Sequence, residues 1–122
     1  MDIIDDIADR LTAAVEAGDR DALGALYADD VVVWHNTDRV ELTKEQSLTG
    51  LDRLVAVTSS RHYRDIRRYH IDGGFVQQHL LHLEFATGSG DLPGCVVVKV
   101  DGGEITRIDE YLDGATMASF AG

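Results

Sequence analysis

Cysteine is almost absent from this chain of 122 residues, and its scarcity excludes several kinds of protein. The one cysteine, Cys95, has no partner within the chain, so no internal disulfide can form and no zinc site can be built from thiolates. Because Cys95 precedes the apolar run VVVKV, we predict a small buried residue at that position.

Basic residues are also few, with 11 Lys and Arg against 22 Asp and Glu, a net charge of −11 and a pI near 4.6. Such an acidic surface repels nucleic acid and anionic lipid, so we expect neither nucleic acid nor membrane as a partner. The one stretch rich in arginine and tyrosine, RHYRDIRRYH, has the composition of a platform for single-stranded nucleic acid. Against the overall charge, we interpret it as an exposed strand that balances carboxylates or forms a dimer contact.

Long apolar runs are missing as well: none approaches the roughly 18 residues of a membrane span. The start, MDIIDDIADR, is acidic and periodic, which predicts no signal peptide. With 44% apolar and 27% charged residues the composition is that of a soluble globular protein. We therefore expect one domain over residues 1–122, located in the cytoplasm.

What the first half does contain is helical periodicity. Apolar residues recur at helical spacing from Ile3 to Val15, and Gly18 is a natural stop. Asp19 can then cap a short second helix over RDALGALYA. Thr43 followed three residues later by Gln46 has the spacing of a capping box, which predicts a third helix ending near Val57.

Strand patterns follow these helices. We predict a strand at VVVWHN, a short returning strand at RVEL, and four longer strands at 61–71, 75–87, 95–100 and 104–112. DGG, GSGDLPG and DGG are the expected turns, and the final GATMASFAG is expected to be a frayed tail. Helices first and antiparallel strands later predict an α+β fold, with a curved, mostly antiparallel sheet over three N-terminal helices.

Two stretches, AAVEAGDRDALGALYADDVVV and GGEITRIDEYLD, resemble the SnoaL-like and ketosteroid-isomerase-like group of the nuclear transport factor 2-like superfamily. The resemblance covers nearly the whole chain. It implies a cone-shaped, cystatin-like sheet around an apolar pocket, in a protein that forms a homodimer. The superfamily includes isomerases, polyketide cyclases, epoxide hydrolases, dehydratases and proteins without chemistry, so the fold alone does not give the function.

Strand alternation indicates which side chains face that pocket. In 75–87 the apolar set Leu81, Leu83 and Phe85 should point inward, which carries His79 and Gln77 with it. In 104–112 the better inward set is Ile108, Glu110 and Leu112. For VVVWHN, strand alternation does not indicate which side chains point inward, because both faces of the strand are apolar.

The resemblance resolves that ambiguity. It places His35 where ketosteroid isomerases keep an aspartate base, and Glu110 where limonene-epoxide-hydrolase-like relatives have an aspartate. The predicted catalytic residues are therefore His35, Glu110 and His79. The residues predicted to bind substrate are apolar: Leu11, Val33, Leu81, Leu83, Val96, Val98, Ile108 and Leu112.

The resemblance also has gaps. Leu11 and Val96 occupy the positions where ketosteroid isomerase holds its oxyanion, so steroid isomerisation by that mechanism is not expected. The arginine–aspartate pair of the epoxide hydrolases is missing from 78–82. Around the site, we expect Trp34 to pack at a sheet or subunit face, Asn36 to act either in a turn or as a pocket donor, and Asp113 to end its strand.

These residue types are suited to acid–base chemistry. A histidine with a reference pKa near 6.5 can accept or donate a proton at neutral pH, and an apolar pocket should lower its pKa and favour the neutral base. A carboxylate beside it can act as the paired acid or orient the ring. Enolisation, aldol-type cyclisation, dehydration and activation of water all become possible, and none of them requires a cofactor. The spacings match no metal-ligand motif, so we predict no metal.

The sequence thus predicts a small cofactor-independent enzyme that binds an apolar cyclic, polyketide-like or steroid-like metabolite. The alternative is a non-catalytic module of the same fold that binds a small molecule or serves dimerisation.

Overall fold

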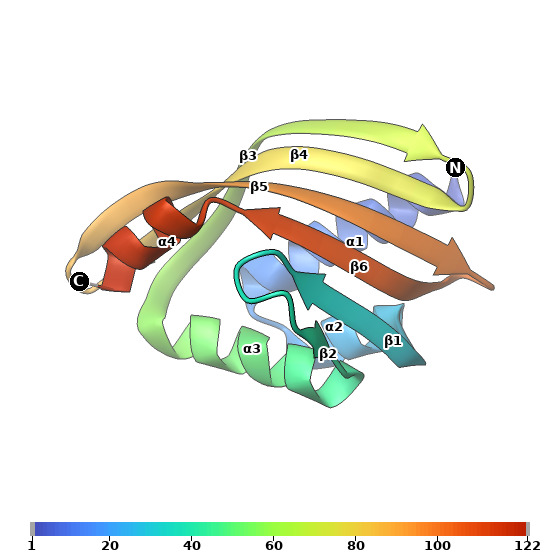
Figure 1. The fold of residues 1–122 in the computed structure, drawn as a ribbon, viewed down its shortest axis with the longest axis horizontal. Coiled ribbons are helices and arrows are strands. Elements are labelled where there is room, and N and C mark those ends of the chain that lie inside the picture. Colours follow the sequence, from blue (N-terminus) through green and yellow to red (C-terminus); the bar gives the residue numbers. More distant parts are fainter. Residues whose placement is uncertain (1, 122) are drawn as a thin grey trace.

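Four helices and one six-stranded sheet make up residues 2–121, the part of the chain described by the computed structural model (Figure 1). The helices are α1 (Ile3–Ala17), α2 (Arg20–Leu26), α3 (Lys44–Val57) and α4 (Gly114–Ala121). The strands are β1 (Tyr27–His35), β2 (Glu41–Leu42), β3 (Thr58–Ile71), β4 (Gly74–Phe85), β5 (Gly88–Asp101) and β6 (Glu104–Leu112). Within these residues no helix is both long and apolar enough to cross a membrane.

The strand order is β2-β1-β6-β5-β4-β3, and every neighbouring pair is antiparallel except β1 and β6. The long strands β3 to β6 arch over α1 and α2, while α3 runs along the open side below β1 (Figure 1). The predicted order of helices followed by a curved, mostly antiparallel sheet is therefore confirmed.

Local sequence signals set the helix ends. Asp2 accepts a hydrogen bond from the Ile4 backbone N–H at 2.8 Å and caps α1, and Gly18 ends that helix with a left-handed φ of 65°. The predicted capping box is present, with Gln46 N–H donating to the Thr43 hydroxyl and the Gln46 side chain accepting from Thr43 N–H.

Several of the expected boundaries are wrong. β1 begins at Tyr27, inside the stretch predicted as the second helix, and β3 begins at Thr58 and not at residue 61. The stretch GSGDLPG is not a turn but the first half of β5, where Gly88 pairs with Phe85 and Leu92 with Leu81, because the chain reverses two residues after β4 ends. The final segment is not frayed but forms α4. Asp113 accepts hydrogen bonds from the Ala115 N–H and the Thr116 hydroxyl there, which begins the helix.

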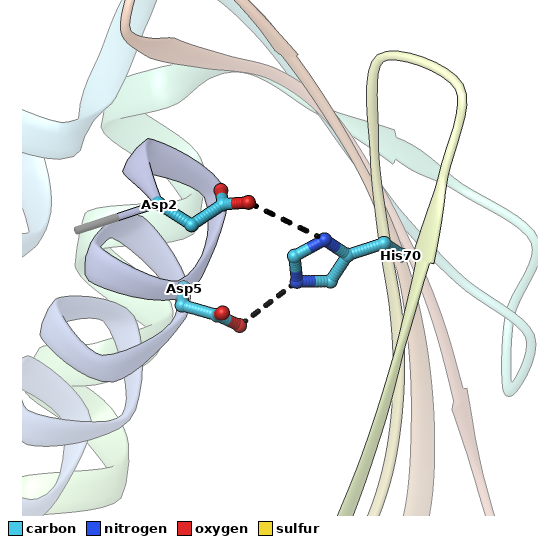
Figure 2. Close-up of side chains that lie close together, drawn as sticks. All are labelled: Asp2, Asp5 and His70. Carbon is cyan, nitrogen blue, oxygen red and sulfur yellow. Dashed lines mark hydrogen bonds and ion pairs between the residues drawn. The ribbon is translucent and has the colours of Figure 1, made fainter.

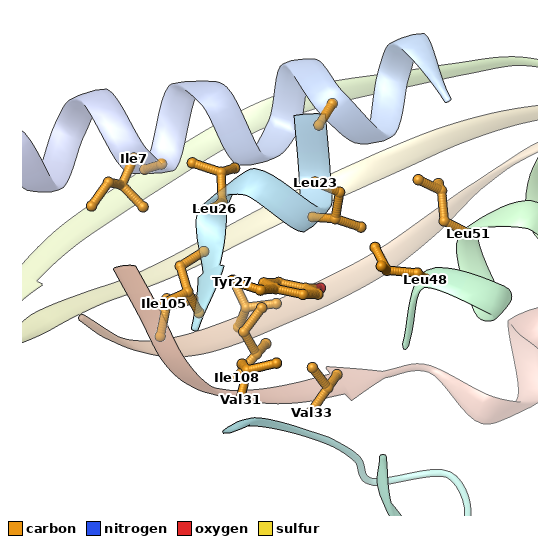
Figure 3. Close-up of a cluster of buried hydrophobic side chains, with 14 of the residues drawn as sticks. Ile7, Leu23, Leu26, Tyr27, Val31, Val33, Leu48, Leu51, Ile105 and Ile108 are labelled. Carbon is orange, nitrogen blue, oxygen red and sulfur yellow. The ribbon is translucent and has the colours of Figure 1, made fainter. Parts of the chain in front are cut away.

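The hydrophobic core joins α1, α2 and α3 to the inner face of the sheet (Figure 3). Side chains such as Ile7, Phe75 and Val98 are 0–1% exposed, so this part of the inner face is closely packed. A second cluster of Leu81, Leu83 and Leu92 is covered by Phe120 from α4. Members of both clusters border the same cavity.

Candidate functional site

A cavity of about 810 Å³ lies between the inner face of the sheet and helices α1, α3 and α4. Its walls are mainly apolar side chains, and its volume is in the range of pockets that hold small organic ligands. Its titratable rings and the Glu110 carboxylate come from β1, β3, β4 and β6, while helices α1 and α3 add the hydroxyl groups of Thr12 and Ser47 to an otherwise apolar cover.

His35 and Glu110 contact each other through their side chains at one wall of the cavity. The parallel pairing of β1 with β6 sets the two residues opposite each other, and their Nε2 and Oε1 atoms are 2.7 Å apart. The hydrogen bond to Glu110 raises the pKa of His35, and this effect outweighs the lowering of the pKa by burial. The expected lowering of the His35 pKa is therefore wrong, because burial alone was considered and the carboxylate partner was not.

Asn36 fastens this wall together. Its Nδ2 donates to the Leu112 carbonyl at 3.1 Å, and its Oδ1 accepts from the Leu112 N–H at 2.7 Å. The Asn36 N–H donates to the Glu110 carbonyl at 3.0 Å. Asn36 lies in the turn that follows β1, which was one of its two predicted roles, and its side chain also ties the end of β1 to the end of β6 and holds His35 against Glu110.

His79 lies on β4, 7% exposed, and lines the same cavity. Its Nδ1 is 3.3 Å from Nε2 of Gln77, and its ring and that of Tyr63 pack in a T-shaped arrangement with centroids 4.7 Å apart. Burial lowers the pKa of His79, so the neutral ring is favoured. His82, by contrast, pairs with Asp91 at 2.7 Å on the other face of the strand, as alternation predicts.

Tyr63 is a cavity residue that sequence reasoning missed. The β3–β4 hairpin begins with Ile71 opposite Gly74, and that register would place Tyr63 opposite His82, on the outer face. A bulge between Arg64 and Arg67, where Asp65 has a φ of 54°, shifts the register by one residue and turns Tyr63 inward, opposite Leu81. The single sequence carries no signal for that bulge.

Tyr27 and Ser47 add a further polar contact at the cavity wall, with their hydroxyl oxygens 3.0 Å apart. Burial raises the pKa of Tyr27 to about 12, and burial also raises the pKa of Tyr63, so both phenols keep their protons at neutral pH. Two neutral hydroxyl groups are thus available near the His35–Glu110 pair.

Most of the residues predicted to bind substrate border the cavity: Leu11, Val33, Leu81, Leu83, Val96, Ile108 and Leu112. Val98 does not. It is 0% exposed and packs in the core with Phe75, its neighbour across β4 and β5, so no space remains beside it for a ligand. Strand alternation correctly predicts that Val96 and Val98 lie on the same face of β5. It does not predict where along that face the close-packed core ends and the cavity begins.

Trp34, which we predicted to pack at a sheet or subunit face, lies on the outer face of the sheet. Trp34 packs edge-on against Tyr111 with ring centroids 5.3 Å apart, and Tyr111 is 47% exposed. Cys95 is half-buried on the strand beside Tyr111, less enclosed than its apolar context predicted.

Asp2, Asp5 and His70 form the one group within residues 2–121 whose ligand atoms are close enough together for a metal ion (Figure 2). His70 lies between the two carboxylates, 3.0 Å from Asp5 and 3.6 Å from Asp2. Arg68 also donates to Asp5, and the group stands at the positive end of α1. Those positive charges disfavour a cation, so the group is better described as an ionic contact between β3 and α1.

The model of the family described as "SnoaL-like domain" matches residues 8–108 of this chain. A search of the curated proteins finds no match.

Solved structures with the same fold cover nearly all of it. A candidate SnoaL-like polyketide cyclase from Shewanella denitrificans is 17% identical, with 98% of this chain and 96% of that chain covered and a TM-score of 0.84. An LEH-like epoxide hydrolase from M. tuberculosis is 21% identical, with 96% and 86% covered and a TM-score of 0.78. An NTF2-like protein of unknown function from Burkholderia pseudomallei is 13% identical, with 98% and 97% covered and a TM-score of 0.84. At these identities the likeness shows the fold, and the predicted nuclear transport factor 2-like architecture is confirmed.

Proposed function

Since this chain belongs to the SnoaL-like domain family, we propose that it is a small cofactor-independent enzyme that moves a proton in an apolar cyclic metabolite. The metabolite would be of polyketide or steroid type, and the reaction an isomerisation, cyclisation, dehydration or hydrolysis. The observation that carries this proposal is the His35–Glu110 pair, which stands at the wall of a largely apolar cavity of about 810 Å³.

The hydrogen bond to Glu110 determines which nitrogen atom of the His35 ring can accept a proton. Glu110 accepts from Nε2 of His35, so the neutral ring keeps its proton on Nε2 and its lone pair on Nδ1. That lone pair can take a proton from a carbon atom next to a carbonyl group, and Glu110 stabilises the imidazolium that forms. Return of the proton to another carbon atom of the bound molecule completes an isomerisation. In a cyclisation the enolate carbon first bonds to a second carbonyl carbon of the molecule, and the proton goes to the alkoxide oxygen that forms.

The rival function is a non-catalytic module that holds the same kind of molecule. It is favoured by Leu11 and Val96, apolar residues that line the cavity at the positions where ketosteroid isomerases hold an oxyanion. A module of this kind would bind the ligand through the apolar walls and return it unchanged.

Exchange of carbon-bound hydrogen separates the two functions. We would incubate the protein in D₂O with 2-tetralone, a two-ring ketone with acidic hydrogens beside its carbonyl, and follow their loss by NMR. Exchange should be on the order of 10²-fold or more faster with the wild-type protein than with His35→Ala, as expected for a positioned base. His82→Ala, which changes a histidine on the outer face, should exchange as the wild-type protein does. Equal exchange by wild type and His35→Ala, together with ligand-induced shifts of the Leu81 and Leu83 methyl signals, would establish the binding module instead.

A homodimer and a cytoplasmic location complete the proposal. Tyr69 and Tyr111 are 54% and 47% exposed, and Trp34 packs against Tyr111. These aromatic side chains suit a contact between two copies of the sheet, because aromatic residues are enriched at interfaces. Sedimentation should give a dimer for the wild-type protein and a monomer for Tyr111→Asp. The cytoplasm is proposed from composition alone, with a net charge of −11 and a single cysteine.

A further inference from the structure

A chain of polar contacts connects the surface group in Figure 2 to the cavity. His70 and Arg68 both contact Oδ1 of Asp5, at 3.0 Å and 3.3 Å, and Arg68 also donates to Asp9 at 2.9 Å. These contacts occupy the two terminal nitrogens of the Arg68 guanidinium. Its third nitrogen, Nε, donates to Oε1 of Gln77 at 3.1 Å.

Arg68 fixes the orientation of the Gln77 amide. Gln77 is 2% exposed, and its two ends have different partners: Oε1 meets Arg68 and Nε2 meets His79. A guanidinium can only donate hydrogen bonds, so the amide oxygen must face Arg68. The amide NH₂ must then face His79, and a flipped amide would set two donors against each other.

The orientation of Gln77 in turn decides where His79 carries its proton. Nδ1 of His79 faces an amide donor at 3.3 Å, so Nδ1 must be the unprotonated acceptor and the neutral ring carries its proton on Nε2. Within residues 2–121, no protein group accepts a hydrogen bond from Nε2 of His79. Every side-chain nitrogen in these residues that is sealed from solvent has a hydrogen-bond partner, so Nε2 is not sealed. Nε2 therefore has some exposed surface, on a residue that borders both the cavity and a smaller hollow lined by Gly94.

Gly94 preserves that space. It stands opposite His79 in the β4–β5 pairing, and a Cβ atom at position 94 would lie 3.0 Å from Nε2 of His79. A side chain at this position would crowd the ring nitrogen, so glycine leaves the N–H uncovered.

We propose that Arg68 and Gln77 are positioning residues that fix His79 as the neutral tautomer with its proton on Nε2, and that this N–H donates to an oxygen atom of the bound molecule. His79 is then a hydrogen-bond donor and not a second base. The inference deepens the proposed function and rests on it for the ligand: the molecule in the cavity carries a carbonyl, enolate or phenolic oxygen, and it is held there while His35 moves the proton.

The tautomer can be measured without any ligand, by the ¹⁵N shifts and couplings of the His79 ring near neutral pH. In the wild-type protein we expect the Nε2–H form in large excess. Arg68→Met leaves the Gln77 amide free to turn, so the fraction with the proton on Nδ1 should rise severalfold. Gln77→Glu places a carboxylate acceptor at Nδ1, and the Nδ1–H form should become the major one. Arg67→Met, the same change at an exposed arginine of the same strand, should leave the ratio unchanged.

A merely structural role for Gln77 would lower stability without moving this ratio. A wild-type His79 with its proton on Nδ1, or a ratio that neither variant changes, would overturn the proposal. If Gln77→Glu fails to fold, Arg68→Met alone decides, because its side chain is near the surface at 16% exposure. None of these results depends on catalysis, so they are separate from the exchange test on His35.

The donor role predicts a preference for the oxygen atom. The ratio of the dissociation constant of tetralin, which lacks the carbonyl, to that of 2-tetralone should fall roughly 2- to 10-fold in Gln77→Glu, because the major form of His79 then has no Nε2–H and the value of one hydrogen bond is lost. An unchanged ratio would show that His79 does not donate to the ligand.

Discussion

The cavity has two polar walls that carry the same ring in opposite settings. On the β1–β6 wall, His35 faces the carboxylate of Glu110, and its pKa is raised. On the β3–β4 wall, His79 faces the amide of Gln77, and burial lowers its pKa. The difference comes from the partner more than from burial, since both rings are partly or largely withdrawn from water.

Such a separation of two pKa values assigns roles within one site. The ring with the raised pKa holds a transferred proton well, which suits His35 to proton abstraction. The ring with the lowered pKa stays neutral and keeps its N–H, which suits His79 to donation. The two walls therefore differ in the partner of the ring, a carboxylate for His35 and an amide for His79, and substitutions at these partners should change the role of each ring.

The largest effect should come from Glu110→Gln, which gives His35 the kind of partner that His79 has. Without the carboxylate, the burial of His35 is opposed only by the more weakly acting charge of Asp38, so its pKa should fall from its raised value. Proton exchange from 2-tetralone should slow on the order of 10²-fold, because the imidazolium loses its counter-charge. Titration of the ring signals by NMR measures the first effect, and a His35 pKa that stays raised would show that Glu110 is not its cause.

The pH profile of the same reaction has a definite sign. His35 acts as a base only when it is deprotonated, so the exchange rate should rise as the pH passes through the raised pKa of His35. In Glu110→Gln the midpoint of that rise should move to lower pH. The His35–Glu110 pair also stabilises the fold most below the unfolded pKa of His35, and that contribution is lost as the pH rises through the folded pKa.

Val96 and Val98, two residues of the same face of β5, test where the cavity ends and the close-packed core begins. Val96 pairs with both Gln77 and Glu110 and so separates the walls, while Val98, two residues on, is in the core. Val98→Ala should lower the free energy of unfolding by about 2 kcal/mol, since it opens a void in close packing. Val96→Ala should cost about 1 kcal/mol, because its methyl groups already border open space. Equal costs in urea unfolding would mean that the cavity extends to Val98 or stops before Val96.

Much of the fold could be predicted from the sequence because its signals are local. The periodicity that gave α1 and the Thr43–Gln46 capping box depends on residues a few positions apart. The site depends on distant pairing. His35 was placed inward only through the family resemblance, and Tyr63 was missed because one bulged residue reverses a strand's faces. The direction of the His35 pKa was wrong for the same reason: Glu110 lies 75 positions away and reaches it through a parallel strand pairing.

Asn36→Ala should loosen one wall and leave the other intact. The change removes two hydrogen bonds to the Leu112 backbone and leaves a partly buried N–H without its acceptor, at a cost of about 1–2 kcal/mol. The His35 ring signals should shift and broaden while those of His79 stay in place. Thr37→Ala, an exposed neighbour, is the control. Equal disturbance of both rings would show that the two walls are mechanically one unit.

The smallest effect should come from His70→Gln, at the outer end of the contacts that lead to His79. The pKa of His70 is raised by its hydrogen bond to Asp5, and the pKa of Asp5 is lowered chiefly by His70. The pair therefore stabilises the fold between these two values. Its contribution should fade as the pH rises through the folded pKa of His70, and again as the pH falls through that of Asp5.

Both groups are exposed, so the difference in urea unfolding between wild type and His70→Gln should be small and should shrink further at high salt. The tautomer of His79 should not change, because Arg68 keeps its bonds to Asp9 and Gln77. A difference that is independent of pH would show that His70 acts by packing and not by charge. A shift of the His79 tautomer in this variant would show that Asp5, and not Asp9, holds Arg68 in place.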